Sequence, residues 1–247
     1  MDYQQKESVF PVPGQGTVAG QGVARTFMAS VFMWMFVALG ISAVAAVAFS
    51  SVPELNDMLR NDLGGMTLLG KVVMFAPLLF VLVMSLGFAR LSAPLLVVLY
   101  IAYAAITGIS FSFIFQFYQL GSVMTCFAAS AAMFGVMAVM GYTTNKDLTS
   151  FGRIMIMGLI GIVVASLINM FLGSERMDYI ISIIGVAVFT GLTAYDVQKI
   201  KRVGQGIEYE GADATQVRKL SILGGLTLYL DFINLFLMLL RVFGSRR

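Results

Sequence analysis

The sequence contains no histidine and a single cysteine, Cys126, among its 247 residues. A lone cysteine cannot form an internal disulfide, and without histidine it leaves no ligand set for zinc, haem or an iron–sulfur cluster. Charge is scarce as well, because 12% of the residues are charged and 59% are hydrophobic, against about 25% and about 45–50% in an ordinary soluble domain. The composition therefore excludes a water-soluble globule, and it predicts no resident cofactor.

The surplus of positive charge is small, with 16 Lys and Arg against 13 Asp and Glu. In a membrane protein such a surplus is typical of loops on the cytoplasmic side rather than of nucleic-acid binding. We therefore expect the lipid bilayer, and no nucleic acid, as the partner of this chain.

Long runs without a charged residue make up most of the chain, and a helix that crosses a membrane needs about 20 apolar residues. The run at 91–145 must fold back once, near 116–121, because as one helix it would exceed the hydrocarbon thickness about twofold. We predict an all-α, polytopic membrane protein. Its seven transmembrane helices are expected at 27–50, 70–89, 92–115, 122–142, 152–173, 179–199 and 219–243.

The chain divides into residues 1–24, a flexible polar tail rich in Gly, Pro and Gln, and a transmembrane domain at 25–247. The first apolar run is too long for the core of a signal peptide, so it is interpreted as a retained helix. With the amino terminus in the cytoplasm, ten of the sixteen Lys and Arg fall on the cytoplasmic side. This count predicts a cytoplasmic amino terminus, and the stretch at 203–218 is predicted as a hydrophilic loop on the same side.

Asp231 lies about twelve residues into the last apolar run, too deep for a short side chain to reach either surface. A charge at the centre of a spanning helix costs about 2.5–3.5 kcal/mol on insertion scales, so it requires a partner or a function. Thr227 and Asn234 share its helix face at i−4 and i+3. This polar face is predicted to point into the bundle.

Asp196 follows Thr190 and Thr193 along one face of the sixth predicted helix. Two interpretations remain open for it, a functional carboxylate or an interfacial ion pair with Lys199 or Lys201. Arg90 ends the second predicted helix and is similarly ambiguous, because an arginine at a helix end normally extends to the headgroups.

Uncharged polar residues form a second line in the third predicted helix, at spacings of three and four that place them on one face. They are Tyr100, Tyr103, Thr107 and Ser110. Asn169 adds one more polar group at depth in the fifth helix, where a lone Asn commonly connects helices. Together these residues predict a polar core within an apolar shell.

The sequence resembles the Bax inhibitor-1 family of membrane proteins, and specifically its bacterial members. The resemblance covers nearly the whole chain. It rests on the run from Tyr103 to Ser110, on Ala194-Tyr195-Asp196-Val197-Gln198-Lys199-Ile200, and above all on Leu228-Tyr229-Leu230-Asp231-Phe232-Ile233-Asn234-Leu235-Phe236.

The resemblance implies a seven-helix fold whose last helix is central, placed in the cytoplasmic (inner) membrane, and a calcium leak that depends on pH. It implies that Asp196 and Asp231 form the pH sensor, ion pathway and calcium (metal) site, and that Arg90 is a latch on Asp231. Two carboxylates in a low-dielectric site cannot both ionise cheaply, and hard cations prefer oxygen ligands. The pore-lining candidates are Tyr103, Thr107, Ser110, Asn169, Thr193, Thr227 and Asn234.

A second hypothesis is a regulatory one: the resemblance to some bacterial relatives implies a modulator of the membrane-anchored AAA protease FtsH that acts through residues 1–24. We predict no enzyme. A membrane aspartyl protease needs Gly-x-Gly-Asp, and Asp231 follows Leu228-Tyr229-Leu230.

Overall fold

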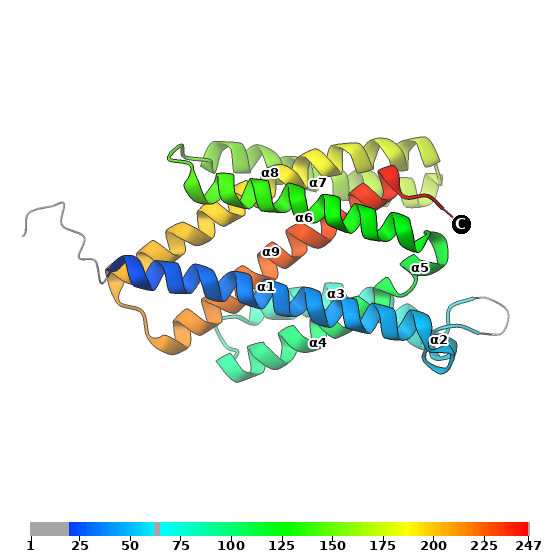
Figure 1. Ribbon diagram of the computed structural model, residues 1–247, viewed down its shortest axis with the longest axis horizontal. Helices are drawn as coiled ribbons and strands as arrows, with labels where there is room; N and C mark the ends of the chain where they lie inside the picture. The colour runs from blue at the N-terminus through cyan, green and yellow to red at the C-terminus, as the bar shows by residue number, and fades with distance from the viewer. Residues whose placement is uncertain (1–19, 62–64, 247) are drawn as a thin grey trace, which may run out of the picture.

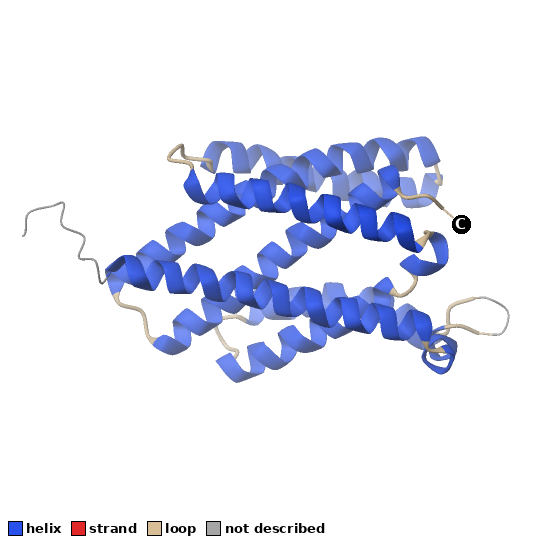
Figure 2. Ribbon diagram, viewed as in Figure 1, coloured by secondary structure: helices blue, strands red, loops and turns tan. Residues whose placement is uncertain are grey.

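The computed structural model describes residues 20–61 and 65–246, and their regular secondary structure is helical (Figure 2). The helices, labelled in Figure 1, are α1 (Gly20–Ser51), α2 (Pro53–Leu59), α3 (Leu68–Gly87), α4 (Ala93–Phe111), α5 (Ile114–Phe117), α6 (Leu120–Thr143), α7 (Thr149–Leu172), α8 (Glu175–Glu210) and α9 (Ala214–Phe243).

Seven of these helices are long and apolar enough to cross a membrane: α1, α3, α4 with its continuation to Phe117, α6, α7, α8 and α9. The predicted all-α polytopic fold is confirmed, and each predicted span overlaps one of the seven. The predicted fold-back near 116–121 is confirmed as well, because α5 ends at Phe117 and α6 begins at Leu120.

The predicted amino-terminal tail lies mostly outside the described residues, which begin at residue 20. The protease interaction predicted for that tail therefore stays a prediction. Residues 20–24 already belong to α1, so the helix begins earlier than the prediction placed it. The reason is that no proline lies between Pro13 and Pro53, so no residue in between forces the helix to stop.

The predicted loop at 203–218 is wrong in its extent. α8 continues to Glu210, α9 begins at Ala214, and the chain reverses at Gly211 with φ +69°. A glycine in this left-handed conformation is a common helix stop. The charged residues at 203–218 belong to helices because α8 and α9 both continue beyond their apolar parts. Burial of Ile207 stabilises this extension of α8.

The last helix is central, as the resemblance implied. α9 is the most buried of the seven helices and packs on α8, α1, α6 and α4, running obliquely through the bundle (Figure 1). The outer positions belong to α7, the least buried, which packs chiefly on α8, and to α3, which packs chiefly on α4.

Glycines allow the helices to approach closely where the packing is tightest. A Cβ at Gly108 of α4 would meet Ser42 O of α1, and one at Gly141 of α6 would meet Ala194 O of α8. Close approach through small residues is the usual way in which helices associate in lipid. These contacts fix α1 on α4, and α6 on the part of α8 that carries Asp196.

Candidate functional site

Asp231 lies near the middle of α9, where its neighbours Leu228, Tyr229 and Phe232 are buried. Only 5% of Asp231 is exposed. Because α9 is surrounded by other helices, this carboxyl group faces protein rather than lipid. The predicted inward orientation of Asp231 is confirmed.

Asp196, half-buried on α8, lies opposite it, and each carboxyl group acts on the other electrostatically. The antiparallel register of the two helices is set by packing on both sides of the pair. A Cβ at Gly185 would lie 2.7 Å from Met238 Sδ, and one at Gly224 would lie 3.5 Å from Ile200 Cγ2. Two acidic residues that are 35 positions apart in the sequence are thus brought together.

The pair has little compensation from the protein. Asp231 Oδ2 is buried and has no hydrogen-bond partner among the described residues. The ion pairs of the described residues join Arg202 to Asp147, Arg241 to Asp178 and Arg246 to Glu175, so none includes Asp196 or Asp231. A buried carboxyl group without a donor or counter-charge requires a proton or a cation.

The structure does not support the interfacial interpretation of Asp196. Lys199 is exposed and forms no ion pair with it in the described part of the chain, although its charge acts on Asp196 electrostatically. Lys201 instead donates to Tyr142 O at 2.8 Å. Asp196 therefore interacts with Asp231 and feels the charge of Lys199, but it forms no ion pair with either lysine among the described residues.

Three predicted pore-lining residues flank the aspartates on the same helix faces. Thr193 precedes Asp196 by one turn and donates to Phe189 O at 2.8 Å. On α9, Thr227 donates to Leu223 O at 3.1 Å, and Asn234 donates through Nδ2 to Leu230 O at 2.9 Å. Since these donors are used within their own helices, the three side chains keep acceptor oxygens one turn from the aspartates, and oxygen is the ligand that a hard cation prefers.

The site is sparse for a metal centre. The described residues hold no group of three or more His, Cys, Asp or Glu side chains that could bind a metal together. Two carboxylates with neutral oxygens are fewer charges than a tight calcium site uses. The arrangement suits a passing cation better than a retained one.

Arg90 does not contact Asp231 in this structure. It lies in the turn between α3 and α4, its side chain is exposed, and it takes part in none of the ion pairs of the described residues. The same turn contacts the start of α9, where Lys219 Nζ lies 4.8 Å from the centre of the Phe88 ring. Lys219 is about 18 Å from Asp231 along α9, at about 1.5 Å per residue. The latch stays a prediction, because Arg90 and Asp231 form no ion pair in the described part of the chain.

The polar line of α4 belongs to a different cluster. Thr107 donates to Tyr103 O at 2.8 Å, and the Tyr103 ring packs edge-on against Tyr229 at 5.5 Å between centroids. Tyr229 is two residues from Asp231, which places it about 200° around α9. Ser110 donates to Val73 O of α3 at 2.6 Å. The structure therefore does not bring Tyr103, Thr107 or Ser110 to the aspartates, because they lie on another side of α9.

Ser42 of α1 is the residue of this cluster that the sequence did not identify. Its hydroxyl donates to Ala104 O at 2.7 Å and lies 2.8 Å from Tyr229 Oη. A serine within an apolar helix usually bonds to its own backbone, so no sequence signal distinguished it. It connects α1, α4 and α9.

Asn169 is also remote from the pair. Its Nδ2 donates to Ser174 O at 3.1 Å and its Oδ1 accepts from Ser174 N at 3.1 Å, which fixes the turn from α7 to α8. Ser174 is separated from Asp196 by about 33 Å of helix. The structure assigns Asn169 to that turn rather than to the surroundings of the aspartates.

Comparison with known proteins gives one family. The family described as "Inhibitor of apoptosis-promoting Bax1" matches residues 24–247. The inner membrane protein YbhL of Escherichia coli K12 is 46% identical over 224 residues, which cover 90% of this chain and 93% of YbhL. An uncharacterized protein of Deinococcus radiodurans is 41% identical over 222 residues, and RP147 of Rickettsia prowazekii is 40% identical over 223. In both cases 90% of this chain and 91% of the relative are covered.

Proposed function

The chain belongs to the Bax inhibitor-1 family, and on that premise we propose that it is a calcium leak channel whose conduction responds to pH. The pair of Asp196, which is half-buried, and Asp231, which is buried, carries this proposal. The two residues lie opposite each other where α8 packs on the central helix, and Asp231 Oδ2 has no hydrogen-bond partner among the described residues.

The pair acts as the sensor because its ionisation state decides what it can bind. With one proton the two carboxyl groups share a hydrogen bond, and α8 and α9 are held together. Without the proton two negative charges repel each other at short range and attract a cation. Lys199 follows Asp196 by one turn of α8, and its positive charge acts on that carboxyl group as well.

Calcium is the proposed permeating ion. Its preference for oxygen ligands matches the carboxylates together with the hydroxyls of Thr193 and Thr227 and the Asn234 amide oxygen. Two charges give weak binding, and an ion that conducts must be able to leave.

Arg90 is the proposed latch. A guanidinium that reaches Asp231 would neutralise the same oxygens that a proton or calcium uses, so latch, proton and cation compete. In the described conformation Arg90 is exposed, which corresponds to the unlatched arrangement. We place the protein in the bacterial cytoplasmic membrane, as the name of YbhL says of that relative, with the amino terminus inside on the basis of the charge count.

The test is a flux measurement in liposomes that contain a calcium dye. Purified wild type is compared with Asp196→Asn and Asp231→Asn from about pH 5 to about pH 8, with magnesium and sodium as competitors. We expect a calcium flux that changes with pH in the wild type and a smaller, displaced change in either variant, because an amide does not ionise and the remaining carboxyl group titrates without a charged neighbour.

Asp178→Asn is the matched control, since Asp178 is a carboxylate of α8 that forms a surface ion pair with Arg241 at 3.4 Å. It should keep the pH response of the wild type. Identical flux in the wild type and both pair variants at every pH would refute the proposal.

A further inference from the structure

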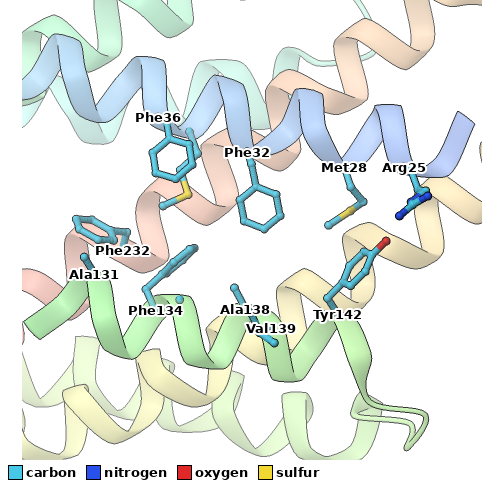
Figure 3. Close-up of a pocket in the computed structure, with 12 residues that line it drawn as sticks. Arg25, Met28, Phe32, Phe36, Ala131, Phe134, Ala138, Val139, Tyr142 and Phe232 are labelled. Atoms are coloured by element: carbon cyan, nitrogen blue, oxygen red, sulfur yellow. The ribbon is translucent and has the colours of Figure 1, made fainter. Parts of the chain in front are cut away.

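A groove runs between α1 and α6 and is separate from the aspartate pair. Its volume is about 510 Å³, and its walls are almost entirely apolar. Buried side chains form its floor, among them Phe134 of α6 and Phe232 of α9, whereas Phe36 of α1 and Val139 of α6 are exposed at its edges (Figure 3). Since both helices cross the membrane, this groove opens sideways toward acyl chains.

One end of the groove is polar. Figure 3 shows Arg25 and Tyr142 together there, with Phe36 and Phe232 at the other end. Arg25, Met28 and Tyr142 also line a second cavity of about 440 Å³, which adds Lys201, Gln205 and Glu208. The apolar groove and the polar cavity therefore adjoin each other at these three residues.

The polar cavity carries an excess of positive charge. Arg25 is exposed and forms no ion pair among the described residues. Lys201 Nζ is fixed at the cavity by its bond to Tyr142 O at 2.8 Å and lies 5.0 Å from the centre of that ring. Glu208 supplies the negative charge of the cavity.

The length of the groove matches one leaflet of a bilayer. From Arg25 to Phe36 the α1 helix rises about 16 Å, and α6 rises the same distance from Ala131 to Tyr142. The hydrocarbon core of a bilayer is about 30 Å thick, so the groove extends from one helix end to about the middle of the membrane.

We propose that this groove binds a phospholipid, with an acyl chain between α1 and α6 and the phosphate on Arg25 and Lys201. An apolar groove of leaflet length is followed by a basic cavity. A phospholipid has the same order, with an acyl chain followed by a charged headgroup. Basic pockets between transmembrane helices are a known form of headgroup site. An acyl chain in the groove would contact α1, α6 and the buried aromatic rings on the floor at the same time. A lipid on a convex part of the protein surface would contact one side only.

Native mass spectrometry of the full chain in detergent tests the proposal. Dioleoyl phosphatidylglycerol and dioleoyl phosphatidylethanolamine are added separately, and retained lipid is counted per protein. We expect the wild type to retain one phospholipid. Retention of both lipids assigns recognition to the shared phosphate, and retention of phosphatidylglycerol alone adds the net negative charge of the headgroup.

Two variants target the two ends of the site, and each has a matched control. Gly135→Leu puts a side chain into the groove, and its control is Gly161→Leu on α7. At both glycines a Cβ meets nothing within 4 Å, so both variants start from an open position, and unfolding midpoints equal to that of the wild type verify that each one folds. Arg25→Gln removes the basic group, and its control is Arg153→Gln, an exposed arginine of α7 whose side chain bonds to Ser150.

We expect Gly135→Leu to abolish retention and Arg25→Gln to weaken binding about fivefold, equivalent to about 1 kcal/mol for one basic residue. Both controls should bind as the wild type does. Equal retention by the groove variants and their controls would overturn the proposal. So would a wild type that carries no lipid and instead binds a second copy of the chain through this face.

Discussion

Asp147 and Asp231 are both carboxylates close to α8, yet their surroundings are opposite. Asp147, in the loop between α6 and α7, is exposed and accepts from the Thr149 hydroxyl at 2.6 Å, the Thr149 amide at 2.9 Å and Arg202 at 2.6 Å. Asp231 is buried, and its Oδ2 has no donor among the described residues. Three donors meet on Oδ1 of the first carboxylate, whereas Oδ2 of the second has none among the described residues.

The difference extends to the neighbours. Gln198 of α8 accepts from Leu148 N and donates to Lys146 O, so the same loop is joined to α8 on both sides of Asp147. Around the aspartate pair, Thr193, Thr227 and Asn234 donate to their own helices instead. The hydrogen-bond donors near Asp147 thus serve the carboxylate, whereas the donors near Asp196 and Asp231 serve backbone carbonyl groups of their own helices.

The largest expected effect comes from replacing the buried carboxylate. At a pH where both carboxyl groups of the pair are ionised, Asp231→Leu should raise the midpoint of thermal unfolding by an amount that corresponds to about 1–4 kcal/mol, because it removes a buried charge without a donor and its repulsion with Asp196. The same variant should show a smaller, displaced change of calcium flux with pH. Fluorescence of Trp34, the one tryptophan of the sequence, reports unfolding in detergent. A lower midpoint would show that Asp231 stabilises the bundle and would remove the contrast with Asp147.

The next effect concerns the packing that positions Asp196. Gly141→Ala should reduce stability by about 1–3 kcal/mol, because its Cβ would collide with the α8 backbone at Ala194. Gly135→Ala, in the same helix, meets nothing within 4 Å. It should be neutral or stabilising by up to about 1 kcal/mol. Unfolding midpoints of the two variants in detergent are compared, and equal values would contradict the assigned contact.

A smaller effect is expected in the cluster formed by Ser42, Tyr103, Thr107 and Tyr229, which is separate from the aspartates. Ser42→Ala removes the bonds to Ala104 O and Tyr229 Oη and should cost about 0.6 kcal/mol, the average for a side-chain hydrogen bond in a membrane protein. Calcium flux and its pH response should be unchanged, because this cluster lies on another side of α9. Loss of the pH response would mean that the two polar sets act together.

The smallest effect is expected at the exposed carboxylate. Hydrogen bonds from Thr149 and then Arg202 hold the pKa of Asp147 below its ordinary value. A carboxyl group whose pKa is lowered by folding stabilises the folded state at any pH above its ordinary pKa. This stabilisation is lost as the pH falls through the lower pKa of the folded state. Asp147→Asn should therefore show slightly faster amide exchange in residues 144–149 at neutral pH. The difference from wild type should stay constant down to about pH 5 and narrow only in stronger acid. A difference that changes near neutral pH would contradict this assignment.

The seven spans could be predicted because a hydrocarbon environment leaves few choices: apolar runs of sufficient length must be helices. The inward face of Asp231 could be predicted for the same reason, since its burial among lipid would be too costly. Asp196 was ambiguous because a sequence shows the lysines that follow it and does not show which face of α8 meets α9.

The remainder of the site depends on angles between helices, which no local pattern gives. Tyr103 and Asp231 are both inward, but they meet different sides of α9. Asn169 looked deep because the ends of α7 and α8 could not be located to within a turn. The Arg90 contact depends on the position of a whole helix pair. The groove between α1 and α6 exists because these two helices do not pack closely, although each has an apolar surface.

The length of α8 has one more consequence. Its 36 residues extend about 54 Å, more than the roughly 40–45 Å of a bilayer with its headgroups, and the helix contains no proline. Asp196 and the exposed Tyr209 therefore lie on one unbroken helix, so a displacement of the end near Tyr209 would be carried along the same rod to the acidic pair.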